Sequence, residues 1–171
     1  NEENPVSTDD IAVLDYSVTL DEDIFYNVDV SGNLDVCAIG SCADANIYVG
    51  PGNTFTASST GSVTVSAHDL VNNGTIDLDT NTFELSGSWV NNSTINVDTS
   101  TVNFVASTTD ETLTDISGSL NFHNLAFDAG VGTSTWTPLS DLTLTGDLAV
   151  TSGTLERTGR DIVVAGDIST G

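Results

Sequence analysis

The chain has almost no positive charge. It contains no lysine, and Arg157 and Arg160 stand against 25 aspartates and glutamates, which gives a formal net charge of −23. Binding to duplex nucleic acid requires clustered lysine and arginine side chains that displace condensed counterions. We therefore expect no nucleic-acid partner, and we expect any self-assembly to depend on salt, because like-charged subunits repel one another.

Methionine and long apolar runs are also missing. No stretch approaches the roughly 20 apolar residues that cross a bilayer, so we expect no membrane span in these 171 residues. A first residue other than methionine, Asn1, indicates a mature product or an excised fragment, and removal of a signal peptide would explain it.

Cysteine is limited to Cys37 and Cys42, which bracket the hexapeptide CAIGSC. Both histidines are distant in sequence, so a zinc site lacks obvious ligands, and we predict a short-loop disulfide between the two cysteines. A reduced pair that fills a core is the alternative. A disulfide would agree with an extracellular or cell-surface location.

An internal repeat is the main feature of the chain. VNNGTIDLDTNTFEL at 71–85 recurs as VNNSTINVDTSTVNF at 90–104, which places Asn72 and Asn73 in register with Asn91 and Asn92. A second echo aligns LTLTGDLAVTSG at 142–153 with IVVAGDISTG at 162–171. FELSGSW at 83–89 fits the same template, with Trp89 at the position of Ile168. These offsets predict a unit of about 19–20 residues.

Apolar and small polar residues alternate within each unit, which is typical of short strands with one buried face. An antiparallel sandwich also has short strands, but it gives no reason for residue identities to recur at a fixed spacing. A coil that returns to the same place every turn does. We therefore predict an all-β, right-handed parallel β-helix (β-solenoid), with one turn, or rung, every 19–20 residues and with stacked asparagines that hydrogen-bond between rungs.

The first 31 residues do not fit the repeat. We predict an N-terminal arm or cap at 1–31 and a β-solenoid at 32–171. The arm could complete the sheet of a neighbouring copy by strand addition. The residues expected to do so are Ile11, Val13, Tyr16, Val18 and Leu20.

The chain from about residue 63 onward resembles the β-solenoid repeats of very long bacterial surface and secreted proteins. The residues that carry this resemblance are VNNGTIDLDTNTFELSGSWVNNSTINVDTSTVNF, SGSLNFHNLAFDAG and TWTPLSDLTLTGDLAVTSGTLERTGRDIVVAGDI. The resemblance implies a parallel β-helix with a surface, adhesive or filament role, and it brings no catalytic residues with it.

Chemical sites are few. His68 and His123 lie in separate units without a nearby serine or cysteine motif, and lysine is absent, so we expect no enzyme and no cofactor. Stacked Asp79 and Asp98 are the candidate calcium ligands, with a solvated acidic face as the alternative. Glycosylation sequons occur at three asparagines, where stacking between rungs is the competing explanation. They are Asn73, Asn91 and Asn92.

Two functions agree with these features. The first is a structural subunit of an extracellular filament or surface appendage that assembles with copies of itself, head to tail, through terminal rungs and N-terminal strand pairing. The second is a stalk or adhesin segment of a long surface protein that binds carbohydrate or another cell.

Overall fold

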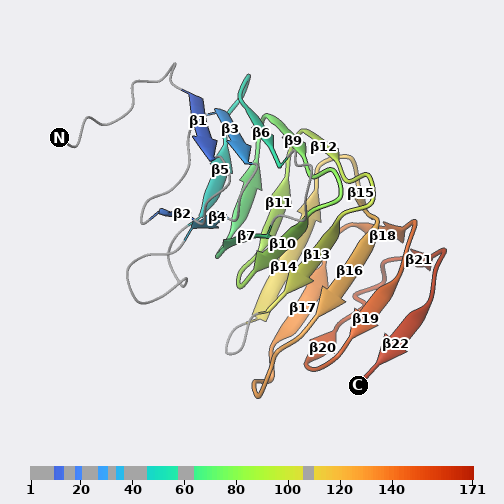
Figure 1. Ribbon diagram of the computed structural model, residues 1–171. Coiled ribbons are helices and arrows are strands. Elements are labelled where there is room, and N and C mark those ends of the chain that lie inside the picture. The colour runs from blue at the N-terminus through green and yellow to red at the C-terminus, as the bar shows by residue number, and fades with distance from the viewer. Residues whose placement is uncertain are drawn as a thin grey trace.

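A computed structural model describes residues 46–57, 64–105 and 110–171 in full, and the backbone of four strands before them. Every strand pairing in these residues is parallel (Figure 1). This confirms the prediction of an all-β parallel solenoid. No helix in the described part of the chain has the length and apolarity needed to cross a membrane.

The strands form four sheets. Sheet 1 contains β1 (Asp10–Val13), β3 (Asn27–Val30), β6 (Thr54–Thr56), β9 (Thr75–Asp77) and β12 (Thr94–Asn96). Sheet 2 contains β2 (Val18–Leu20), β4 (Leu34–Val36), β7 (Thr64–Ala67), β10 (Thr82–Leu85), β13 (Thr101–Phe104), β16 (Asn124–Phe127), β19 (Leu148–Val150) and β22 (Ile168–Thr170). Sheet 3 contains β5 (Ile47–Val49), β8 (Leu70–Asn72), β11 (Trp89–Asn91), β14 (Asp110–Asp115), β17 (Thr135–Pro138) and β20 (Thr154–Leu155). Sheet 4 contains β15 (Ser119–Phe122), β18 (Asp141–Leu144) and β21 (Ile162–Val164).

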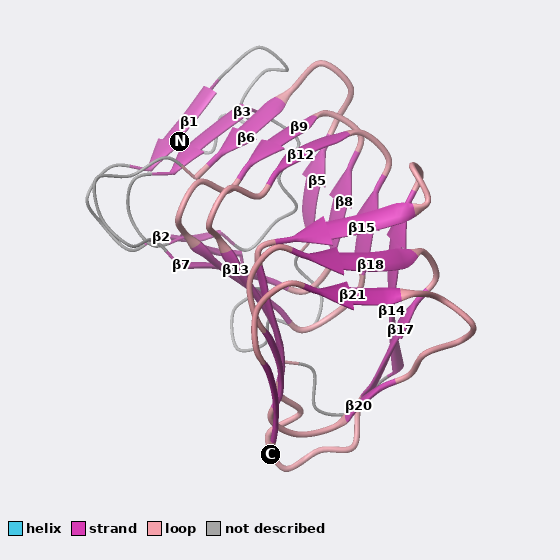
Figure 2. Ribbon diagram, turned by 90° about the vertical axis from the view of Figure 1, so that its right-hand side faces the viewer, coloured by secondary structure: helices cyan, strands magenta, loops and turns pink. Residues whose placement is uncertain are grey.

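One rung takes one strand from each of three sheets. The chain runs from sheet 1 to sheet 2 to sheet 3, as in β9, β10 and β11, and then begins the next rung. After β12 the first position of the rung is taken by sheet 4, whose first strand β15 does not pair with β12. Figure 2 shows β15, β18 and β21 as a group set apart from β6, β9 and β12. The coil is therefore continuous in sheet 2 but changes sheet on one side.

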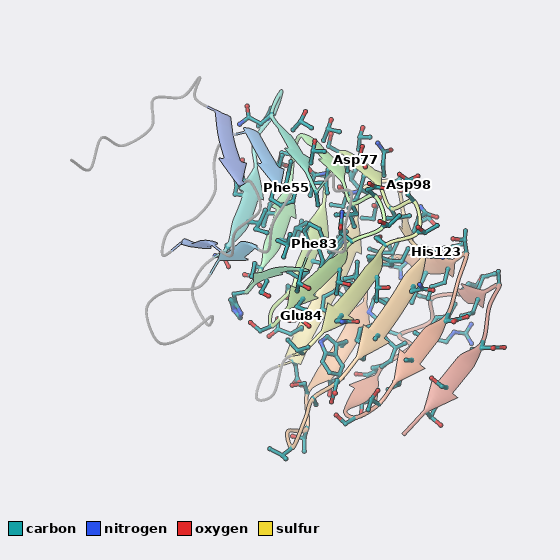
Figure 3. All side chains as sticks on the ribbon, in the orientation of Figure 1. Phe55, Asp77, Phe83, Glu84, Asp98 and His123 are labelled. Atoms are coloured by element: carbon teal, nitrogen blue, oxygen red, sulfur yellow. The ribbon has the colours of Figure 1, made fainter. Side chains whose placement is uncertain are left out.

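The core lies inside the coil, because successive side chains of a strand point to opposite faces. In β10 the side chains of Phe83 and Leu85 are fully buried, whereas Thr82 and Glu84 are half-buried on the outer face (Figure 3). Burial of one such apolar side chain contributes about 1.5–3 kcal/mol. Aromatic rings pack inside the coil, between rungs and, for Phe127 and Trp136, within one rung, at centroid distances of 5.0–5.6 Å.

The predicted register is confirmed at both repeats. Ile76 pairs with Ile95, and Leu142 pairs with Ile162. The predicted spacing is wrong in the middle of the chain, where 24 residues separate Asn91 from Asp115 and 25 separate Asp115 from Ser140. The additional residues lie between the end of sheet 2 and the part of sheet 3 that pairs with β11, and they include the first three residues of β14, which pair with β17 alone. A solenoid tolerates such insertions because loop closure costs little extra free energy as a loop lengthens.

The described strands near the N-terminus also pair in parallel. β1 pairs with β3 in sheet 1, and β2 pairs with β4 in sheet 2. These sheets continue without interruption into the repeat region. The division at residue 31 between an arm or cap and the solenoid stays a prediction.

Candidate assembly surface

Buried asparagines form a hydrogen-bonded ladder along the corner where the strands of sheet 3 end. Asn72 Nδ2 donates to Asn91 Oδ1 over 2.7 Å, and Asn91 Nδ2 donates to Asp115 Oδ2 over 2.6 Å. A second ladder on the surface joins Asn92 Nδ2 to Asn73 Oδ1 over 3.1 Å. The predicted stacking of both asparagine pairs is therefore confirmed.

Ladder residues at this corner also shape the turn that follows them. The Oδ1 atom of Asn72 accepts the N–H of Gly74 over 3.0 Å, and that of Asp115 accepts the N–H of Ser117 over 2.7 Å. Such bonds to the backbone two residues on are typical of Asx turns. One side chain thus ends a strand and also ties its rung to the next.

A different ladder occurs where a new strand begins. Asp69 Oδ1 accepts the N–H of Ser88 over 2.6 Å, and Asp147 Oδ1 accepts the N–H of Asp167 over 2.8 Å. The acceptor always belongs to the earlier rung and the N–H to the next. Aspartate and asparagine suit this position because their oxygens accept hydrogen bonds at short range. Part of the acidic composition therefore has a structural purpose. The further members of these ladders are Asn46 to Asp69, Asn124 to Asp147 and Asp141 to Asp161.

Where a glycine precedes the donor residue, the ladder acceptor lies against the position that a side chain would occupy. A Cβ atom on Gly87 would lie 2.1 Å from Asp69 Oδ1, and one on Gly166 would lie 2.2 Å from Asp147 Oδ1. Real Cβ atoms do not approach other atoms so closely. The glycine that precedes the donor residue is therefore explained by steric exclusion.

This steric rule explains why one alignment of the repeat is wrong. Gly87 lies between sheet 2 and sheet 3, whereas Gly166 lies between sheet 4 and sheet 2. Ile168 pairs with Leu148 in sheet 2, and Trp89 pairs with Leu70 in sheet 3. Trp89 is buried as predicted, but it does not share a position with Ile168. The same ladder chemistry at two corners produced the sequence similarity.

The last rung exposes residues that belong to the core of earlier rungs. Leu148 is 5% exposed, whereas Ile168, which pairs with it, is 65% exposed. Asp161 Oδ1 accepts from Arg157 Nη2 over 3.1 Å. The carboxylate of Asp167 lies at the end of its ladder and has no donor among the described residues. This end, with β20, β21 and β22 as edge strands, is the candidate assembly surface.

The proposed calcium ligands lie in turns between sheet 1 and sheet 2. Asp79 and Asp98 both have positive φ angles, 49° and 37°, in the left-handed region that aspartate tolerates better than most residues. Figure 3 shows Asp98 at the outer margin of the coil. No group of three or more metal-ligating side chains occurs in the described residues. The turn geometry accounts for these aspartates, and calcium binding stays a prediction.

Several predicted residues cannot be placed. Cys37, Cys42 and Tyr16 lie outside the described residues, so the disulfide stays a prediction. Ile11 and Val13 lie in β1, and Val18 and Leu20 lie in β2. Both strands have a partner within the chain and stand at the ends of sheets 1 and 2. Their pairing with a neighbouring copy stays a prediction.

Sequence reasoning missed the contact between His68 and Ser86, because the two residues are 18 positions apart and meet only by stacking. His68 Nδ1 lies 3.1 Å from Ser86 Oγ, and His68 Nε2 lies 3.9 Å from Asp69 Oδ1. The neighbouring N–H groups of Gly87 and Ser88 are already bonded, to His68 O and Asp69 Oδ1. A catalytic serine needs such donors to stabilise an oxyanion. The arrangement therefore has the geometry of a structural contact between rungs.

Comparisons with known proteins found no family model that matches the chain, no match among curated proteins and no match among solved structures.

Proposed function

We propose that the chain is a structural subunit of an extracellular filament or surface appendage, and that copies assemble head to tail through their terminal rungs. The observation that supports this proposal is the exposure of Ile168. This residue is stacked on the buried Leu148 of the earlier rung, but it is 65% exposed in the last rung. Exposed edge strands with apolar side chains favour the addition of another strand.

The parallel topology supports the same arrangement. All strands of sheet 2 run in one direction, with β2 at one end and β22 at the other. A second copy can therefore place its β2 beside β22 as a parallel neighbour without turning over. This contact joins two different surfaces, and it extends into a filament when the rotation between copies does not close into a ring.

Repulsion between the negatively charged copies opposes this contact, so the salt concentration should control assembly. Each copy carries a formal charge of −23, and the repulsion between copies decreases as salt shortens the Debye length to about 8 Å at 0.15 M and about 3 Å at 1 M. Assembly should therefore increase with ionic strength. Adhesion through charged contacts would show the opposite dependence.

The test uses the purified 171-residue chain, light scattering and negative-stain electron microscopy over a range of salt concentrations. We expect polymers that lengthen with salt, and fewer polymers after deletion of residues 1–20. A chain that stays monomeric at all salt concentrations and at high protein concentration would contradict the proposal. Normal polymers after the deletion would exclude the role of the N-terminal strands.

The alternative is a stalk or adhesin segment of a long surface protein that binds carbohydrate or another cell. In that case the next covalent rung covers Ile168. Intact mass spectrometry of the natural polypeptide separates the two functions, because a subunit has a mass close to 17.7 kDa plus any modification, whereas a stalk is far larger.

A further inference from the structure

The three glycosylation sequons occupy one corner of two successive rungs, but their surroundings differ. They are Asn73–Gly74–Thr75, Asn91–Asn92–Ser93 and Asn92–Ser93–Thr94. We propose that Asn92 is the residue that accepts an N-linked glycan on the folded chain. In the natural setting this inference rests on the proposed extracellular location.

Asn91 is excluded by its hydrogen bonds. Its side chain is 2% exposed, and its Nδ2 atom donates to Asp115 Oδ2 over 2.6 Å and to Ser93 O over 3.0 Å. A glycan replaces one of these two N–H groups. Modification of Asn91 would therefore break the bond to Asp115 or the bond to Ser93 and place a sugar at a buried nitrogen.

Asn73 is held between two rungs. The N–H groups of Asn73 and Thr75 donate to Val49 O and Asn53 O of the earlier rung, over 2.7 and 2.9 Å, as those of Asn92 and Thr94 donate to Asn72 O and Gly74 O. The difference between the two tripeptides lies in burial and in the next rung. Gly74 between them is buried, and a Cβ atom there would lie 2.4 Å from Asn53 O. Gly74 O also accepts from the next rung. A transferase could reach this tripeptide only after local unfolding.

Asn92 lies in an exposed tripeptide. Asn92, Ser93 and Thr94 are all exposed, and sheet 1 ends at β12, so no further strand of that sheet lies over Thr94. Asn92 Nδ2 donates to Asn73 Oδ1 over 3.1 Å. A primary amide has two N–H groups. The glycan replaces one, and the other keeps the bond to Asn73.

The reaction requires an oligosaccharide that is activated as a lipid-linked pyrophosphate. Asn92 Nδ2 forms a bond to C1 of the first sugar and loses one proton. The C1–O bond to the carrier breaks, and the lipid pyrophosphate leaves with the electron pair. No oxidation or reduction takes place.

Ile116 gives the first sugar an apolar neighbour. Its N–H donates to Asn91 O over 2.9 Å, and Asp115 pairs with Asn91, so Ile116 follows opposite Asn92 in the next rung. The side chain of Ile116 is 72% exposed. A sugar on Asn92 would lie beside it and reduce its contact with water.

The test uses folded chain, purified from a host that does not glycosylate, together with an oligosaccharyltransferase and a lipid-linked oligosaccharide. Intact mass is measured after the reaction, at low salt so that the chain is not polymerised. Three hydroxyl variants each remove one sequon and leave every asparagine in place. Thr94→Ala removes that of Asn92, Ser93→Ala that of Asn91, and Thr75→Ala that of Asn73.

We expect the wild type, Ser93→Ala and Thr75→Ala to gain one glycan and Thr94→Ala to gain none. Circular dichroism confirms that each variant is folded before the reaction. Transfer that persists in Thr94→Ala, or that is lost in Ser93→Ala or Thr75→Ala, would overturn the proposal. A wild type that is modified only after unfolding in urea would also overturn it. None of these outcomes depends on whether the chain forms filaments.

Discussion

Asn72 and Asn91 are joined across one rung by a hydrogen bond of 2.7 Å from Asn72 Nδ2 to Asn91 Oδ1, inside the coil. Asn91 passes the ladder on to the buried carboxylate of Asp115. A buried ladder of this kind is stabilising only while every member has its partner, because an unpaired polar group in the interior is costly.

Replacement of Asn91 by alanine should therefore destabilise the chain. It removes the acceptor of one Asn72 N–H and the donor to Asp115 Oδ2, while the bonds of Asn72 to Thr94 O and of Asp115 to Ser117 remain. The loss of these two buried bonds should cost about 1–3 kcal/mol. Urea unfolding followed by circular dichroism measures the change. Asn92→Ala is the matched control, because its ladder is exposed and its loss should change stability by about 0.5 kcal/mol or less. Equal effects of the two variants would show that the buried ladder has no special importance.

Gly146→Ala tests whether the glycine before a ladder donor is required, in the ladders that lie where a new strand begins. A Cβ atom at this position would lie 2.3 Å from Asn124 Oδ1, so the side chain of Asn124 must leave its bond to Asp147. We expect a loss of about 1–3 kcal/mol, in the range of overpacked sites. Gly50→Ala is the control, because its new Cβ would meet its nearest neighbour at 3.5 Å, an ordinary contact. A thermal melt that is unchanged by Gly146→Ala would refute the rule.

Variants of Asp167 distinguish a hydrogen bond at the assembly contact from a general effect of charge repulsion. If a neighbouring copy donates an N–H to Asp167 as Asp167 itself does to Asp147, Asp167→Ala should reduce polymer formation. Asp167→Asn keeps an acceptor oxygen and removes a charge, so it should assemble at least as well as the wild type. Glu156→Ala removes an exposed charge without a ladder and should also assemble at least as well. Light scattering at fixed salt compares the variants, and similar behaviour of both alanine variants would favour charge alone.

The carboxyl group of Asp128 should have a lowered pKa. The hydrogen bond from Ser152 Oγ and then that from the N–H of Gly130, both 2.7 Å long, lower the pKa of Asp128 because they favour the carboxylate. Since the pKa is lower in the folded state, the associated stability is present above the unfolded-state pKa of about 3.9 and is lost as the pH falls through the folded-state pKa. Carboxyl-carbon NMR titration should show a rise of the Asp128 pKa in Ser152→Ala and no change in Thr151→Ala. An unchanged pKa in Ser152→Ala would contradict this explanation.

Much of the fold was predictable because a solenoid repeats its local environment. The alternation of Phe83 and Leu85 with polar residues indicated a strand with one buried face, and the recurrence of Asn72 as Asn91 indicated stacking at a fixed spacing. The contact of His68 with Ser86 was not predictable, because it depends on which residues happen to lie above one another. The longer rungs were also not predictable, because residues inserted between two strands change the repeat spacing while the strands still stack.

The order of the residues is enough to specify short parallel strands with stacked asparagines, because side-chain alternation and repeat spacing are properties of that order alone. The folded arrangement is needed to show that Gly87 and Gly166 serve different corners and that sheet 4 replaces sheet 1 after β12. The corner that a glycine serves and the sheet that follows a strand depend on the rungs above and below, which local sequence does not specify.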